Sequence, residues 1–276
     1  MRIAFLGDIN GSPGRQVVSQ QIPILRERWR PDLIIANAEN ARAGSGLTPD
    51  LYRQFRGLGI DACTLGDHAF RDSKIVPLLD DPAEPVARPA NLSRKAPGKR
   101  SIRLHASDRL AADVWVITVL GRIFMPLPAD DPFAAVDAFL ESLPVAPPRR
   151  GIVLVEAHME ATSEKAALGR YLDGRVTAVL GSHTHVPTAD AKILRGGTGF
   201  ITDVGMCGPY DSVIGRDTDQ VLRAMTTSVH VPYEMGQGGE ALCGVVIDVD
   251  ESSGRCVAIE RVELAGDRSR APFRAV

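Results

Sequence analysis

Six short apolar runs of this chain each end at a cluster of polar residues. The runs occupy residues 3–6, 33–36, 62–65, 152–155, 176–180 and 199–201. Aliphatic and β-branched runs of this kind predict strands that are buried in a sheet. The polar residues after each run then lie at the carboxyl end of its strand, which is where α/β sheets place their sites. We therefore expect an α/β protein with one site built from several strand ends.

Helical patterns lie between these runs. They occupy residues 13–29, 48–58, 72–79, 132–143 and 163–172, with start signals at Ser12, at Thr48 and at Thr162 or Ser163. Pro23 is expected to kink or split the first helix, because proline lacks a backbone N–H donor. Further strands are predicted at residues 101–104, 114–119, 242–249 and 256–264. This pattern fits one mixed sheet, or two sheets packed face to face with helices outside.

The segments show no convincing linker or repeat between them. Proline-rich residues 81–89 and 144–148 are predicted to be loops, and the second loop separates two halves whose polar clusters belong to one site. Residues 1–276 are therefore expected to form a single domain.

The composition is that of an ordinary globular protein. Charged residues make up 24% of the chain and the net charge is −2, which leaves no excess of positive charge for coating nucleic acid. The four cysteines are widely spaced and form no CxxC motif, as expected of reduced thiols. We see neither a signal-peptide core nor an apolar stretch long enough to cross a bilayer. The expected location is the cytoplasm, with no membrane partner.

The run at residues 176–180 leads into Gly181-Ser182-His183-Thr184-His185. Two imidazoles two residues apart at a strand end favour a metal site over a place in the core. The strand-end residues that can bind metal are Asp8, Glu39, Asn40, Asp67, His68, His158, His183 and His185. Imidazole suits iron, zinc and manganese, and a carboxylate can bridge two ions. Since two such ions can stabilise both oxygens of a phosphoryl displacement, the set indicates phosphoester hydrolysis.

Six motifs occur in an order that is similar to one family. They are Gly7-Asp8, Asn37-Ala38-Glu39-Asn40, Gly66-Asp67-His68, His158-Met159-Glu160-Ala161-Thr162-Ser163-Glu164-Lys165, Gly181-Ser182-His183-Thr184-His185 and Ile201-Thr202-Asp203-Val204-Gly205-Met206. Together they closely resemble the YmdB-like branch of the calcineurin-like metallophosphoesterases, from the first strand to about Glu263. The resemblance implies a four-layer α/β/β/α sandwich, in which two mixed sheets are flanked by helices, with a dinuclear metal site.

The same resemblance implies the ligands and the reaction. One metal would be held by Asp8, Glu39, Asn40 and His185, and the other by Glu39, Asp67, His158 and His183, so that Glu39 bridges them. His68 would be the general acid that protonates the leaving oxygen after attack by a metal-bridging hydroxide. The implied substrate is a 2′,3′-cyclic nucleotide, a small phosphodiester that can derive from RNA. The two transition-metal ions would be iron, manganese or zinc, no other cofactor is implied, and a homo-oligomer is expected.

Three departures from the wider family pattern are visible. Many metallophosphoesterases begin with Asp-x-His, but this chain has Asp8-Ile9-Asn10 and therefore lacks a histidine ligand there, as the YmdB-like branch does. The usual Gly-Asn-His signature carries Asp67, whose added negative charge should hold its metal more tightly and weaken its Lewis acidity. Arg71 follows where the family typically has an acidic residue. We expect Arg71 to compensate the charge of Asp67 or to meet a substrate phosphate.

Other residues near the motifs have two interpretations each. Thr162, Ser163 and Lys165 either contact substrate or belong to a capped helix start. Tyr210 either stacks on a nucleobase or is buried in a turn. Glu156 and Asp203 are expected to orient the ligating imidazoles. His105 and His230 lie outside every motif and are expected to be surface or structural residues.

Two alternative functions remain open at this stage. The same site would serve a metallophosphomonoesterase or nuclease, because the shape of the substrate pocket cannot be inferred from the sequence. It would also serve a weakly catalytic regulatory protein that binds metal and nucleotide. Asp67 favours the regulatory alternative, whereas the presence of His68 argues against it.

Overall fold

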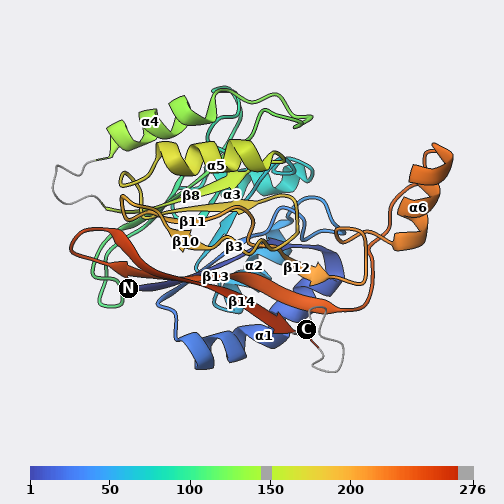
Figure 1. Ribbon diagram of the computed structural model, residues 1–276, viewed down its shortest axis with the longest axis horizontal. Coiled ribbons are helices and arrows are strands. Elements are labelled where there is room, and N and C mark those ends of the chain that lie inside the picture. Colours follow the sequence, from blue (N-terminus) through green and yellow to red (C-terminus); the bar gives the residue numbers. More distant parts are fainter. Residues whose placement is uncertain (144–150, 267–276) are drawn as a thin grey trace.

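A computed structural model describes residues 1–143 and 151–266 as four layers (Figure 1). Within these residues, two mixed sheets pack face to face and helices cover the outer face of each. Figure 1 shows α1 (Gly11–Trp29) beneath one sheet, with α4 (Pro132–Ser142) and α5 (Thr162–Tyr171) above the other. This arrangement confirms the predicted α/β/β/α sandwich of two mixed sheets.

The first sheet has the strand order β2-β12-β13-β1-β3-β4-β5, with β14 also paired to β13. Its strands are β1 (Arg2–Leu6), β2 (Asp8–Ile9), β3 (Leu33–Asn37), β4 (Ala62–Thr64), β5 (Val86–Ala87), β12 (Met206–Pro209), β13 (Glu240–Asp250) and β14 (Arg255–Ala265). Strands β1, β3, β4 and β5 are parallel, so their carboxyl ends share one edge of the sheet.

The second sheet has the strand order β10-β11-β9-β8-β7-β6. Its strands are β6 (Ile102–Leu104), β7 (Val114–Leu120), β8 (Ile152–His158), β9 (Ala178–Ser182), β10 (Lys192–Ile193) and β11 (Gly199–Ile201). Strands β7, β8, β9 and β11 are parallel, so residues that follow β8 and β9 emerge side by side.

The remaining helices complete the outer layers. Residues of α2 (Pro49–Gly57), of the 3-10 helix η1 (Ser73–Ile75) and of α3 (Val76–Asp80) pack with α1 against the first sheet. By contrast, α6 (Thr218–Thr227) projects from the body at the right of Figure 1. Within the described ranges, no helix combines the length and the apolar character needed to span a membrane.

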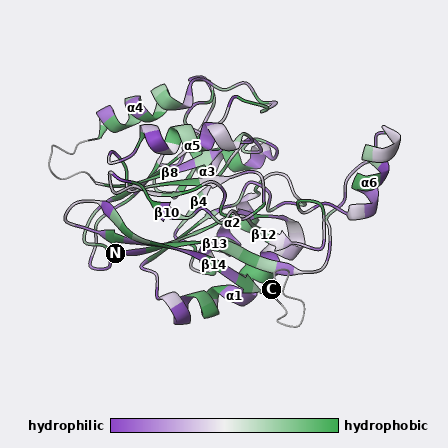
Figure 2. Cartoon of the chain, viewed as in Figure 1, coloured by the Kyte–Doolittle hydropathy of each residue, from purple (hydrophilic) through white to green (hydrophobic). Residues whose placement is uncertain are grey.

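Three hydrophobic cores hold the layers together. The first lies between the helices and the first sheet and contains Phe55, and the third lies outside the second sheet and contains Leu168. The second lies between the sheets, where Phe5 of β1 and Leu154 of β8 belong to one cluster. Figure 2 shows the corresponding concentration of hydrophobic residues on the strands. Burial of each such side chain contributes about 1.5–3 kcal/mol, so the core between the sheets fixes how their strand ends meet.

The predicted strands are all present, with shifted ends. The run at residues 152–155 continues to His158, so Glu156 and His158 lie inside β8 rather than after it. The run at residues 176–180 forms β9 two residues later, which brings Ser182 into the strand. The prediction that residues 81–89 form only a loop was wrong, because β5 lies within them. The predicted loop at residues 144–148 lies outside the described residues.

Helix starts were predicted with mixed success. The signal at Thr48 is confirmed, because its side chain accepts a hydrogen bond from Leu51 N at 3.2 Å. The signals at Ser12 and at Thr162 or Ser163 were wrong: α1 follows Asn10 and α5 follows Ala161, neither with a side-chain cap.

Pro23 does not split the first helix. Helix α1 runs unbroken from Gly11 to Trp29 with Pro23 inside it. Pro23 and Ser19, four residues earlier, are both exposed. The Ser19 carbonyl that loses its helical donor can therefore hydrogen-bond to water, which limits the cost of the proline.

We predict that Pro23→Ala stabilises the protein. Alanine restores the missing hydrogen bond on the exposed face without disturbing the buried side of α1, so the free energy of unfolding should rise by about 1–3 kcal/mol. Urea denaturation measures the change, with the exposed-face variant Gln20→Ala as control. A lower unfolding free energy for Pro23→Ala would show that the proline shapes α1 in a way the core requires.

Candidate metal centre

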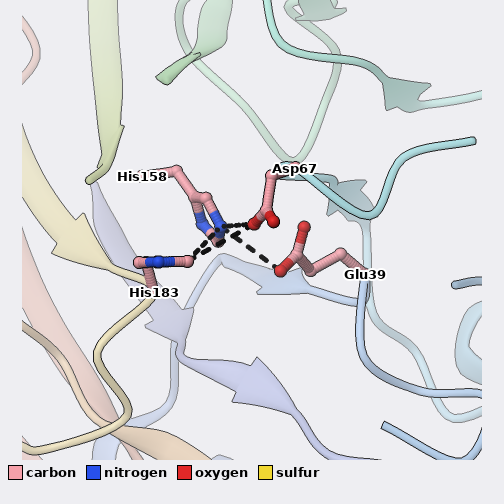
Figure 3. A group of neighbouring side chains, drawn as sticks. All are labelled: Glu39, Asp67, His158 and His183. Atoms are coloured by element: carbon pink, nitrogen blue, oxygen red, sulfur yellow. Dashed lines mark hydrogen bonds and ion pairs between the residues drawn. The ribbon is translucent and has the colours of Figure 1, made fainter. Parts of the chain in front are cut away.

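Four of the predicted ligands meet at one point between the two sheets. Glu39 and Asp67 follow β3 and β4 of the first sheet, while His158 ends β8 and His183 follows β9 of the second (Figure 3). Each offers a donor atom, and these four atoms lie within 4.8 Å of one another. Figure 3 shows the side chains pointing toward a common centre.

The spacing of these donors suits a metal ion. His158 Nε2 lies 3.0 Å from Asp67 Oδ1, 3.1 Å from His183 Nδ1 and 3.2 Å from Glu39 Oε1. Neighbouring donors bound at about 2.0–2.2 Å to one ion are themselves roughly 2.8–3.6 Å apart in octahedral or tetrahedral shells. His158 is fully buried and Glu39 nearly so. A mixed set of buried nitrogen and carboxylate donors at this spacing fits a transition-metal ion.

Gly66 leaves room for this convergence. A Cβ atom at this position would lie 2.2 Å from His158 Nε2 and 2.4 Å from Glu39 Oε2. Any side chain there would push apart the donors that must meet. Position 66 therefore requires glycine, because the backbone there passes too close to the donor cluster to leave room for a side chain.

Asp8, Asn40 and His185 adjoin this cluster on the side of β2. Asn40 Nδ2 lies 3.2 Å from His185 Nε2, 3.3 Å from Glu39 Oε1 and 3.5 Å from Asp8 Oδ1. His185 Nε2 lies 3.7 Å from Asp8 Oδ1. Three acceptor atoms thus surround the amide nitrogen of Asn40. The structure brings all seven predicted ligands together, four in the compact cluster and three beside Glu39.

His68 lies at the rim of the same centre. Its backbone N–H donates to Glu39 Oε2 at 2.9 Å, and its Nδ1 lies 2.7 Å from Asn40 Oδ1. The Nε2 atom lies 3.7 Å from Asp67 Oδ2. The side chain is 23% exposed, so it contacts both the cluster and solvent. His68 is therefore placed where a group can exchange protons with a bound molecule.

A buried hydrogen-bond chain orients His158. Ser182 Oγ donates to Glu156 Oε1 at 2.7 Å and lies 2.9 Å from His158 Nδ1. The serine therefore accepts from His158 Nδ1–H, so Nε2 is the nitrogen that faces the cluster. Asn37 and Thr118 also donate to Glu156. Glu156 thus orients an imidazole as predicted, but it does so through Ser182.

The loop that carries His183 and His185 is held in an unusual backbone conformation. Both histidines have positive φ angles, 89° and 64°. Asp203 Oδ2 accepts hydrogen bonds from Thr184 N at 3.1 Å and Thr184 Oγ1 at 2.7 Å. Buried Lys165 pairs with the same carboxylate at 2.8 Å. Such strain persists where surrounding contacts determine it, and here the contacts through Asp203 hold two donors in place.

The carbonyl of Ile214 orients the second imidazole of this loop. His185 Nδ1 lies 2.9 Å from Ile214 O and therefore donates to it, so Nε2 is the atom that faces Asp8 and Asn40. His183 Nε2 lies 3.4 Å from a Glu160 carboxylate oxygen, which leaves His183 Nδ1 for the cluster. Each of the three histidines thus has one nitrogen engaged outside the cluster and one directed into it.

Carboxylates and imidazoles of the cluster shift one another's pKa values. Burial would raise the pKa of Asp67, but hydrogen bonds from His158 and His183 outweigh burial and hold it below the ordinary 3.8. The same holds for Asp8. Burial would raise its pKa, but the contact with His185 outweighs burial and holds the pKa below 3.8. Burial would lower the pKa of His158, yet Glu39 and Asp67 raise it well above 6.5. Without a metal, protons therefore compensate the carboxylates.

The structure decides several of the two-way interpretations. Lys165 is fully buried against Asp203, which excludes direct substrate contact in this conformation. The Tyr210 hydroxyl is held by the Met206 backbone at 3.0 Å, which favours the buried-turn interpretation over stacking. Among the described residues, no ion pair joins Arg71 to Asp67, so charge compensation through a direct contact is not supported. His105 and His230 are exposed and lie outside the cluster, as expected.

Sequence reasoning gave no role to Ser182, Glu160 or Ile214. Ser182 and Glu160 lie inside quoted motifs, so their position next to a histidine was an available signal. Ile214 acts through its backbone carbonyl, which carries no sequence signal. Asn10 was identified only as a missing ligand, yet its Nδ2 lies 3.4 Å from His185 Nδ1, and its buried Oδ1 has no hydrogen-bond partner among the residues that the structure describes.

A four-layer α/β/β/α sandwich with a cluster of histidines and carboxylates at its strand ends defines the metallophosphoesterase class. Residues 4–262 match the model of a family described as YmdB-like protein, and the chain belongs to this family. It is 43% identical over 267 residues to the 2′,3′-cyclic-nucleotide 2′-phosphodiesterase of Bacillus subtilis (strain 168), covering 97% of this chain and 98% of that protein.

Two solved structures share the fold over nearly their whole length. One is a protein from Thermus thermophilus, with a TM-score of 0.87 and 42% identity, covering 96% of this chain and 99% of that chain. The other, from Mycoplasma pneumoniae, is described as a novel phosphatase. Its TM-score is 0.87 and its identity 30%, covering 96% of this chain and 93% of that chain. The predicted family is therefore confirmed.

We predict that the stabilisation of the protein by bound metal grows with pH. The raised pKa values of His158 and His185 stabilise the metal-free fold fully below pH 6.5, and that stability is lost as the pH rises through their folded values. The depressed pKa values of Asp8 and Asp67 contribute stability above 3.8 that is lost only as the pH falls through their folded values. Metal binding displaces the imidazole protons, so the gain in Tm on metal addition should grow with pH.

Calorimetry measures the gain in Tm on metal addition. The Tm of chelator-treated protein is compared with that of manganese-loaded protein from pH 6.5 upward. His105→Ala, which removes an exposed histidine outside the cluster, is the control. A metal-induced gain that shrinks as the pH rises would show that the imidazoles are not the groups that bind the ion.

Proposed function

We propose that this protein is a phosphodiesterase that hydrolyses 2′,3′-cyclic nucleotides at a centre of two transition-metal ions. The observation that carries the proposal is the four-donor cluster of Glu39, Asp67, His158 and His183. It occurs in a chain that is 43% identical over 97% of its length to a protein named for this activity. The burial and spacing of the donors support a metal-dependent reaction.

In this proposal Glu39 lies between two ligand sets. Asp67, His158 and His183 complete the compact set, and Asp8, Asn40 and His185 complete the adjoining one. Bound iron, manganese or zinc would supply Lewis acidity for the phosphate oxygens and a water of lowered pKa at neutral pH. The chain itself fixes which nitrogen of each imidazole faces inward, through Ser182, Glu160 and the Ile214 carbonyl.

Asn40 and His68 are coupled in the proposed reaction. Coordination by Asn40 requires its amide oxygen to face Asp8 and His185, which turns the amide N–H group toward His68 Nδ1, 2.7 Å from the present amide oxygen. An N–H donor there leaves the imidazole proton on Nε2. During hydrolysis the bond from phosphorus to the ribose 2′-oxygen breaks, and we assign His68 Nε2 as the donor of the proton that this oxygen takes up.

A phosphatase is the second candidate function, because a family member of known structure is described as one. Initial rates on 2′,3′-cyclic AMP, 3′,5′-cyclic AMP, a nucleotide monoester and a short RNA separate the two. A preference for the monoester or the RNA would reject the cyclic-nucleotide proposal. Metal binding without turnover of any of the four would favour a regulatory protein.

The proposal also covers the domain organisation, the location and the assembly of the protein. The whole chain acts as one domain, which is supported by the core that residues of both sheets share. The enzyme works in the cytoplasm, which is supported by four free cysteines, all buried and all within the described ranges. Assembly into a homo-oligomer stays a prediction.

We predict that His68→Ala lowers kcat on 2′,3′-cyclic AMP by about 10²–10⁴-fold, because the leaving oxygen then departs without a positioned proton donor. The bound metal should be retained, since His68 is outside the four-donor cluster. Steady-state kinetics with elemental analysis of the same samples test both statements, with His105→Ala as the control. An unchanged kcat in metal-replete His68→Ala would remove His68 from the reaction.

A further inference from the structure

The segment after β7 begins beside a donor of the metal centre and carries an exposed aromatic ring. Leu120, the last residue of β7, pairs with His158 in the parallel ladder, and Gly121 N donates to His158 O at 3.0 Å. The segment that continues from Gly121 therefore leaves the sheet directly beside a donor of the cluster. Its next residues include Ile123 and Phe124, which are 43% and 83% exposed.

Buried Glu164 holds this segment in place. Its carboxylate accepts hydrogen bonds from Arg122 N at 2.9 and 3.1 Å and from Ile123 N at 3.3 Å. The side chain of Glu164, from the first turn of α5, is only 7% exposed. A Cβ atom at Gly121 would lie 2.5 Å from the same carboxylate. The backbone before Phe124 is thus fixed by a buried carboxylate rather than left as a free loop.

Phe124 itself is presented to solvent at a cost. Its φ angle is 62°, a left-handed conformation that is an outlier for a bulky residue. The ring also keeps most of its apolar surface in water. Strain of this kind is typical of ligand clamps, where surrounding contacts over-determine the backbone. Neither the strain nor the exposure of Phe124 contributes to the packing of the fold.

The short chain between Gly121 and Phe124 limits how far the ring can lie from the metal centre. Three residues separate it from Gly121, so its Cα lies within about 10–11 Å of the contact with His158. In Figure 1 the green connection between β7 and α4 extends on the same side of the molecule as β12 and α6. The length of this segment therefore allows the exposed ring to reach the base of a nucleotide whose phosphate is bound at the cluster.

We propose that Phe124 is the stacking platform for the nucleobase of the substrate, an inference that rests on the proposed cyclic-nucleotide activity. An aromatic face stacks on any base, because every base presents a π surface, and larger purines gain more contact than pyrimidines. The subsite therefore supports binding of nucleosides in general and favours adenosine over cytidine. The nucleobase would thus contact the segment after β7, which supplies no donor to the metal centre.

The test compares substrates with and without a base. Kinetics on 2′,3′-cyclic AMP and on 1-O-methylribose 2′,3′-cyclic phosphate are measured for wild type, Phe124→Ala, Phe124→Tyr and the control Val257→Ala, which truncates an exposed apolar side chain on β14. Phe124→Ala should raise KM for cyclic AMP roughly tenfold at unchanged kcat, with no change on the base-free substrate. Phe124→Tyr, which keeps an aromatic face, should resemble wild type.

Equal effects of Phe124→Ala on both substrates, or none on either, would overturn the subsite. A fall in molecular mass by light scattering together with equal losses would identify Phe124 as a contact between copies instead. Calorimetric binding of cyclic AMP separates this inference from the proposed function. If the wild-type protein binds cyclic AMP more tightly than Phe124→Ala does but turns over neither substrate, the phosphodiesterase proposal fails and the base subsite stands. If the wild-type protein does not bind cyclic AMP, the phosphodiesterase proposal and the base subsite both fail.

Discussion

The structure depends on the meeting of two carboxylates and two imidazoles that come from opposite sheets. Glu39 and Asp67 lie after strands of the first sheet, and His158 and His183 lie at strand ends of the second. Two carboxylates at such short distance are stable in a buried place only when positive charge compensates them, either imidazole protons or metal ions. The hydrophobic core between the sheets brings these groups together, and Gly66 keeps the space between them clear.

Buried polar groups behind the metal-ligand side chains fix the orientation of those side chains. Glu156 acts on His158 through Ser182, and Asp203 holds the backbone between His183 and His185 through Thr184. Lys165 neutralises Asp203, so a fully buried ion pair behind the donors helps to set the geometry of the site. The same principle extends to Glu164, which fixes the segment before Phe124. Carboxylates that bind backbone or side-chain donors thus position both the metal ligands and the proposed base subsite.

Much of this could be predicted from the sequence, because its signals are local. Apolar runs bounded by polar clusters indicate buried strands, and every ligand candidate was a polar residue next to such a run. The rest depends on tertiary contacts. The Ile214 carbonyl has no side-chain signature, and β12 contains Gly208 and Pro209, which are poor strand formers. Helix α6 had a usable signal, since Asp217 caps it by accepting from Gln220 N, but the packing of this projecting helix could not be inferred.

We propose that the donors from the two sheets form one centre for two metal ions that share Glu39. Metal stoichiometry is its most direct test, measured by elemental analysis and native mass spectrometry after reconstitution with manganese. We expect two ions per chain for the wild type and a loss of both for Glu39→Ala, because only Glu39 belongs to both ligand sets. One ion per chain in the wild type, or two retained by Glu39→Ala, would contradict it.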